Sequence, residues 1–217
     1  MSDHLSLEAV DVDGAIREAL DETQAASRSS FLKKALFTGG TLAFGGVLFG
    51  GLPKLATGAP SASQDAAILN FALTLEYLES SFYTEAVANG ALSGPVLKFA
   101  QVVKSHEDAH VAFLKQALGS KAVAKPTFNF ASTTSNQGQF IATSIALEDT
   151  GVGAYNGQGP NLTKATLGAA AMIVSVEARH AAWIRDIAAK LPAPYGFDPL
   201  FTKTQTLAKV GATGFIQ

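Results

Sequence analysis

Residues 105–115 read Ser-His-Glu-Asp-Ala-His-Val-Ala-Phe-Leu-Lys, and residues 175–185 read Ser-Val-Glu-Ala-Arg-His-Ala-Ala-Trp-Ile-Arg. The two segments match at serine, glutamate, histidine and alanine, and their last three positions pair similar side chains. Each segment contains one Glu-x-x-His motif, formed by Glu107 and His110 in the first and by Glu177 and His180 in the second. Because residues three apart are neighbours on a helix surface, each motif places a carboxylate beside an imidazole.

A second repeated pattern precedes each motif. Glu76 is followed seven residues later by Tyr83, and Glu148 is followed seven residues later by Tyr155. Seven residues are nearly two helical turns, so each glutamate and its tyrosine share one helix face. The chain is therefore internally duplicated, and each half supplies a glutamate, a tyrosine and a Glu-x-x-His motif.

This duplication predicts a site for two metal ions. Two facing Glu-x-x-His helices and a single glutamate from each of two further helices form the ligand set of dimetal carboxylate bundles. We expect six ligands: Glu76, Glu107, His110, Glu148, Glu177 and His180. Oxygen and imidazole ligands without thiolate suit iron or manganese, and four carboxylates balance two divalent cations. From residue 86 onward the chain has no glutamate outside these motif positions, whereas a surface role would scatter them.

Two neighbouring residues admit other roles. Glu79 lies one turn after Glu76 on the same face, and its counterpart in the repeat is Gly151. It is either an extra or substitute ligand or a residue outside the ligand set. His106 adjoins Glu107 but corresponds to Val176 in the other half, so we expect it at the surface or just outside the ligands.

The aromatic residues of the repeat have two interpretations. Tyr83 and Tyr155 are either core aromatics or hydrogen-bond donors to the ligating carboxylates. Phe113 and Trp183 occupy matching positions, and we expect both to pack in the core.

The composition excludes several other functions. Only 16% of the 217 residues are charged, and the net charge of −2 provides no basic surface for nucleic acid. The absence of cysteine excludes disulfides, iron–sulfur clusters, thiolate zinc sites and thiol catalysis.

Helix-capping and helix-breaking residues predict an all-α fold. We expect four helices at about 64–88, 94–118, 137–156 and 162–190. Ser61 or Ser63 caps the first helix, Pro95 begins the second, and Gly119 ends it. The long connection after Gly119 makes this a four-helix bundle with a long crossover between its second and third helices.

The predicted organisation has four parts: an acidic mobile extension (1–26), an export signal or anchor with its linker (27–62), the bundle (63–191) and a C-terminal tail (192–217). Within the second part, basic residues precede an uncharged run at 35–52 and a small-residue stretch, which is the pattern of an export signal.

The segment 27–33, Ser-Arg-Ser-Ser-Phe-Leu-Lys, resembles a twin-arginine signal, with Ser29 in place of the second arginine. We therefore expect a periplasmic or otherwise extracytoplasmic protein. The alternatives for residues 35–52 are an uncleaved membrane anchor and a glycine-rich helix docked on the bundle.

Residues 70–79, Asn-Phe-Ala-Leu-Thr-Leu-Glu-Tyr-Leu-Glu, followed by Phe82 and Tyr83, resemble a bacterial branch of the ferritin-like superfamily that is related to plant desiccation-associated proteins. The superfamily includes ferritins, bacterioferritins and rubrerythrins, and the resemblance covers about residues 64–190. It implies a di-iron centre that reacts with dioxygen or peroxide, with electrons from iron or from an unidentified reductant. By this resemblance Glu76 and Glu148 are the single glutamates, Glu107 and Glu177 bridge the ions, and His110 and His180 are terminal ligands.

The resemblance implies an exported ferroxidase or peroxidase-type oxidoreductase that holds two iron ions, with manganese as the alternative. We expect no catalytic residue beyond the ligands, which hold geometry and charge. Without cysteine the chain has no rubredoxin-type electron-transfer module, and its loops and tail disfavour a 24-subunit cage; a homodimer remains open. The rival is a structural or stress-protective envelope protein whose site is metal-braced or vestigial.

Overall fold

The structure is a computed structural model that describes residues 60–217. In this range the long helices are α4 (Ala62–Ala88), α5 (Gly94–Leu118), α6 (Gln137–Gln158) and α7 (Lys164–Ile187), followed by the shorter α8 (Lys203–Thr213). Short 3₁₀ turns connect them: η1 (Gly119–Lys121), η2 (Ala131–Thr134) and η3 (Gly159–Asn161). The extension expected at 1–26 and almost all of the segment expected at 27–62 lie outside the described residues.

The helix ends follow the predicted capping residues. The hydroxyl of Ser61 accepts a hydrogen bond from the backbone N–H of Gln64 at the start of α4. Pro95 lies in the first turn of α5. Gly119 ends that helix with a positive φ of 55°, a backbone conformation that residues with a side chain rarely adopt. The third helix continues two residues past the expected 156, and the fourth spans 164–187 rather than 162–190.

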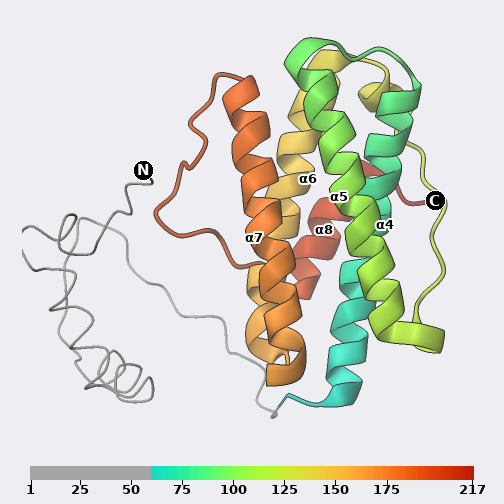
Figure 1. The fold of residues 1–217 in the computed structure, drawn as a ribbon, viewed down its shortest axis with the longest axis vertical. Helices are drawn as coiled ribbons and strands as arrows, with labels where there is room; N and C mark the ends of the chain where they lie inside the picture. Colours follow the sequence, from blue (N-terminus) through green and yellow to red (C-terminus); the bar gives the residue numbers. More distant parts are fainter. Residues whose placement is uncertain (1–59) are drawn as a thin grey trace, which may run out of the picture. The chain divides into compact units, whose positions relative to one another are not determined.

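The four long helices form two hairpins. α4 packs against α5 and α6 packs against α7, and the hairpins meet through contacts of α4 with α6 and of α5 with α7. Residues 119–136 cross between the hairpins. Figure 1 shows α4 to α7 along one axis, with α8 behind them, where it contacts α6. The described residues thus confirm the all-α four-helix bundle with a long crossover.

The C-terminal tail contains a helix, α8, in addition to the four that the sequence predicted. Thr202 and Gln205 form a capping box at the start of α8, and Gly214 ends the helix in the left-handed conformation. The tail is anchored to α6, since the backbone N–H of Phe201 donates to the carbonyl of Gly153 over 2.8 Å.

Two clusters of buried apolar side chains occupy different stretches of α5 and α7. On α5 the first cluster ends at Val103 and the second begins at Val111, so Glu107 falls between them. On α7 the second cluster ends at Val174 and the first resumes at Trp183. On these two helices the Glu-x-x-His motifs therefore lie between two apolar clusters, where water has little access.

One expected core residue lies at the surface. Phe113 is 42% exposed, whereas its counterpart Trp183 packs edge-on against Phe99 with ring centroids 5.3 Å apart. The residue that corresponds to Phe99 in the other half is Ala169, which has no ring for Phe113 to pack against. The expectation for Phe113 was wrong because the repeat does not extend to this packing partner.

Within residues 60–217, no helix combines the length and apolar character that a bilayer span requires. The anchor considered at 35–52 lies outside the described residues.

Candidate metal centre

All six predicted ligands converge between the four long helices. Each long helix supplies a glutamate, and α5 and α7 also supply a histidine: Glu76 from α4, Glu107 and His110 from α5, Glu148 from α6, and Glu177 and His180 from α7. The four glutamates have no exposed surface, and His110 is the most exposed of the six residues, with 12% of its side chain accessible. Burial of four carboxylates is strongly unfavourable unless cations or protons compensate their charge.

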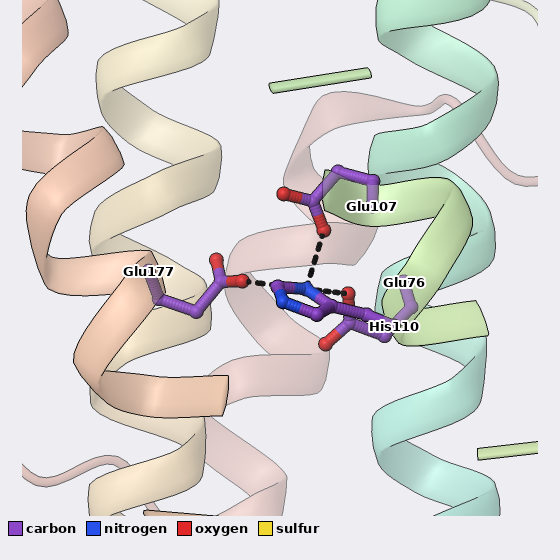
Figure 2. A group of neighbouring side chains, drawn as sticks. All are labelled: Glu76, Glu107, His110 and Glu177. Carbon is purple, nitrogen blue, oxygen red and sulfur yellow. Dashed lines mark hydrogen bonds and ion pairs between the residues drawn. The ribbon is translucent and has the colours of Figure 1, made fainter. Parts of the chain in front are cut away.

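One group of donor atoms surrounds His110. Its Nδ1 lies 3.2 Å from Oε2 of Glu76, 3.2 Å from Oε2 of Glu107 and 3.1 Å from Oε1 of Glu177. Figure 2 shows the imidazole of His110 directed toward Glu177 on the left, with Glu107 above the ring and Glu76 on its other side. These four residues each offer a ligand atom within 4.8 Å of the others, a spacing that a single cation can span.

A second group surrounds His180. Its Nδ1 lies 3.2 Å from Oε1 of Glu107 and 3.2 Å from Oε2 of Glu148. Together with Glu177 these residues form another set of donors within 4.8 Å of one another. Glu107 and Glu177 belong to both groups, which is the arrangement expected of carboxylates that bridge two ions.

Several of the oxygen and nitrogen atoms that could bind a metal at this centre lack hydrogen-bond partners. The buried atoms without a partner include Glu107 Oε1, Glu148 Oε2, both carboxylate oxygens of Glu177 and Nδ1 of His180. Buried polar atoms are normally paired, so a cluster of orphaned acceptors indicates that something else satisfies them. The residues present therefore fit a pair of divalent cations.

The two tyrosines connect the halves of the repeat. The hydroxyl of Tyr83 donates to Oε1 of Glu148, and the hydroxyl of Tyr155 donates to Oε1 of Glu76. In both cases the other carboxylate oxygen faces the nearest histidine. Each tyrosine thus orients a glutamate of the opposite half, an arrangement that spacing along one helix could not reveal.

The protonation of the centre reflects its crowded charge. Burial, followed by repulsion from neighbouring carboxylates, raises the pKa of Glu79, Glu107 and Glu177 well above the usual range. Burial also opposes ionisation of Glu76, but hydrogen bonds, chiefly from His110, bring its pKa below the ordinary value. Burial and the adjacent glutamates raise the pKa of both tyrosines, which therefore stay protonated as donors.

The histidines respond in the opposite way to burial. Burial alone would lower the pKa of His110, but the adjacent carboxylates of Glu107, Glu177 and Glu76 raise it to about 12. Burial likewise opposes protonation of His180, yet Glu148 and the other carboxylates raise its pKa. Without cations, the folded protein compensates its buried carboxylates with bound protons.

Glu79 is buried but belongs to neither donor group. It lies close to Gly151, its counterpart in the repeat. A Cβ added to Gly151 would lie 3.5 Å from Oε1 of Glu79 and 3.2 Å from Oε2 of Glu177. The glycine therefore leaves room for both carboxylates, a role that the sequence repeat indicates only in hindsight. A cavity of about 10 Å³, room for about one water molecule, adjoins this pair.

His106 is exposed, as expected, but it also contacts the centre. Its Nδ1 lies 2.8 Å from Nε2 of His180, and the two rings are stacked. The sequence placed His106 next to Glu107 on α5, but it could not show that the ring reaches across to α7.

Comparison with known protein families identifies the domain that contains this centre. The family model described as Ferritin-like domain matches residues 64–190, which is more than half of the chain. The chain belongs to the ferritin-like family. The matched range begins within α4 and ends just after α7, so this ferritin-like domain contains all six predicted ligands. No curated protein sequence matches the chain.

Proposed function

We propose that this ferritin-like protein binds two iron ions and uses them to oxidise Fe(II) or to reduce peroxide or dioxygen. The observation that carries the proposal is the pair of donor groups that share Glu107 and Glu177, two buried glutamates of whose four carboxylate oxygens three lack a hydrogen-bond partner. Iron bound there would supply electrons and open coordination positions for a small oxidant. Manganese, which accepts the same ligands, is the alternative metal.

The protein residues have three tasks in this proposal. Glu107 and Glu177 would hold both ions, while Glu76 and Glu148 each direct one oxygen at the centre because a tyrosine binds the other. The histidines complete the two donor groups through Nδ1. These residues maintain geometry and charge, and none is assigned as an acid–base catalyst.

Burial limits what can react there. The carboxylates have no exposed surface, and His110 is the most exposed of the six predicted ligands, with 12% of its side chain accessible. A small oxidant such as dioxygen or peroxide suits such a centre, whereas a bulky organic substrate could not reach the carboxylates without opening the bundle.

The test is iron oxidation by the whole protein. Metal-free protein is loaded with Fe(II) without oxygen, air is admitted, and the near-ultraviolet absorbance of ferric iron is followed. We expect oxidation faster than in a protein-free solution, and we expect Glu177→Gln to abolish this acceleration. Asp186→Asn, an exposed acid-to-amide change on the same helix, is the control and should react like the wild type.

Two results would contradict the proposal in different ways. Oxidation no faster than in the protein-free control, in a protein that nevertheless binds two ions, favours the rival structural or stress-protective role. Oxygen release from peroxide by manganese-loaded protein, with no iron oxidation, favours a catalase-like manganese centre.

We also propose that the protein is exported to the periplasm or beyond. The support is the sequence of residues 27–62, in which Arg28, Lys33 and Lys34 precede the uncharged run. Replacing these three residues with glutamine should retain the protein in the cytoplasmic fraction of a host that exports the wild type. Equal distribution of both proteins would contradict export by this segment.

A further inference from the structure

His106 breaks the symmetry of the repeat through a direct contact with a predicted ligand. Its ring lies on α5 and stacks on His180 of α7, with centroids 5.1 Å apart and planes 16° apart. The shortest contact joins Nδ1 of His106 to Nε2 of His180 over 2.8 Å, which is a hydrogen-bond distance.

This contact determines which nitrogen of His180 can bind a cation. Nδ1 of His180 faces Glu107 and Glu148 and has no hydrogen-bond partner. A neutral histidine binds metal through its unprotonated nitrogen. When Nδ1 of His180 is the ligand, the ring proton is on Nε2, from which it is donated to Nδ1 of His106. His106 then carries its own proton on Nε2.

His110 has no equivalent support. Its Nδ1 faces the centre in the same way as that of His180. The residue at the position of His106 in the second half of the repeat is Val176, whose side chain has no hydrogen-bond acceptor. Within residues 60–217, the hydrogen bonds of His110 all involve Nδ1. The two predicted metal positions therefore differ in how firmly their histidines are held.

On the basis of the proposed function, we propose that His106 is a positioning residue that makes the two cation positions unequal. It holds the ring of His180 with Nδ1 directed at the centre, so the position bounded by Glu107, Glu148, Glu177 and His180 binds its cation more tightly. His106 is not itself a ligand, because it belongs to neither donor group. Groups that orient a metal-binding histidine typically change metal affinity about 10–100-fold.

Substitutions at position 106 test this role with Co²⁺, which is not oxidised by air and whose visible absorbance reports its coordination. His106→Val installs the residue found at the matching position of the repeat and removes the acceptor. His106→Asn keeps an acceptor near the position of Nδ1. Ser105→Val places the same β-branched side chain at a neighbouring exposed position of α5 and controls for its effect on the helix.

We expect wild-type protein, Ser105→Val and His106→Asn to bind two Co²⁺ ions with unequal affinities. In His106→Val, the tighter step should weaken about 10–100-fold while the other step changes less than about threefold. Unchanged binding in His106→Val, equal weakening of both steps, or an His106→Asn as weak as His106→Val would overturn the role of His106. Failure of the wild type to bind Co²⁺ would instead contradict the metal site on which this role rests.

A second readout does not depend on metal. In metal-free protein the Nε2 proton of His180 should exchange slowly with water. It belongs to the buried ring of His180 and is donated to Nδ1 of His106. Nitrogen-15 NMR of the imidazoles should show this proton in the wild type and in His106→Asn, and it should disappear in His106→Val. A proton that persists in folded His106→Val would contradict the contact itself.

Discussion

At the scale of single residues, Tyr83 and Tyr155 orient two of the predicted carboxylate ligands by hydrogen bonds. Tyr155 reaches from α6 to Glu76 of α4, and Tyr83 reaches from α4 to Glu148 of α6. Without these donors, one oxygen of each buried glutamate would have no partner, and leaving a buried acceptor unpaired is costly.

Replacing Tyr155 with phenylalanine should destabilise the metal-free protein. Hydrogen bonds to charged groups contribute about 1.5–3 kcal/mol, and we expect the free energy of unfolding to fall by about this amount, with a similar loss for Tyr83→Phe. Urea denaturation measures both changes. Tyr195, with 64% of its surface exposed, provides the matched control, and Tyr195→Phe should have almost no effect. Equal stabilities of all three variants would contradict the assigned hydrogen bonds.

Glycine 151 provides a second test at this scale. The added methyl group of Gly151→Ala would approach Glu177 Oε2 to 3.2 Å, so the proposed bridging carboxylate must shift. We expect Co²⁺ affinity to fall on the order of tenfold, although alanine favours the helix by up to about 1 kcal/mol. Gly168→Ala on α7 is the control, because nothing lies within 4 Å of its added Cβ. It should stabilise the protein slightly without changing Co²⁺ affinity, and the same behaviour in Gly151→Ala would refute the crowding.

At the scale of elements, a side chain of α4 caps the start of α7. The carboxylate of buried Asp65 accepts hydrogen bonds from the backbone and hydroxyl of Thr163 and from the hydroxyl of Thr166. This contact joins the first and last long helices of the bundle. Burial opposes ionisation of Asp65, but these hydrogen bonds lower its pKa below 3.8.

Asp65→Ala should therefore loosen the N-terminus of α7. Loss of a capping carboxylate costs about 0.5–2 kcal/mol, and urea denaturation near neutral pH should show a decrease of this size. Because the folded pKa is depressed, the contribution is present above 3.8 and is lost as the pH falls through the folded value. A difference between wild type and variant that grew toward acid pH would contradict this account of Asp65.

Local sequence predicted the four long helices because their ends carry strong signals. Ser61, Pro95 and Gly119 act locally, so their effect is legible without tertiary structure. The same kind of local signal, the capping box of Thr202 with Gln205, marks the start of α8. Packing is different, because the exposure of Phe113 depends on which residue the facing helix presents.

At the scale of the whole molecule, the fold and the six converging residues were predictable because the chain is duplicated. What the duplication could not reveal is where the halves differ: Glu79 facing Gly151, and His106 in contact with His180. Repeat spacing identifies residues that share a helix face, whereas contacts across helices depend on the relative rotation of those helices. The asymmetric contacts of the centre therefore became visible only in the three-dimensional structure.

The protonation of the centre predicts how the stability of the metal-free protein depends on pH. The folded protein raises the pKa of Glu79, Glu107, Glu177, His110 and His180. It therefore binds more protons than the unfolded chain above the ordinary glutamate value of 4.5, and stability falls as the pH rises from there. Glu76, whose pKa is lowered, acts in the opposite direction and loses its contribution as the pH falls below 4.5.

Urea denaturation at about pH 5.5 and about pH 8 should show the metal-free protein to be more stable at the lower value. Divalent cations replace these protons, so Co²⁺ should bind more tightly at the higher pH and release protons as it binds. Metal-free protein that gained stability between the two values would contradict the assigned directions.

The central claim is that two cations bind between the helices and share Glu107 and Glu177. A crystal structure of protein loaded with Fe(II) without oxygen, with anomalous scattering recorded at the iron edge, tests this claim most directly. We expect two anomalous peaks, one next to His110 and one next to His180, with Glu107 and Glu177 binding both. Peaks confined to the protein surface, or a single peak that neither glutamate contacts, would contradict it.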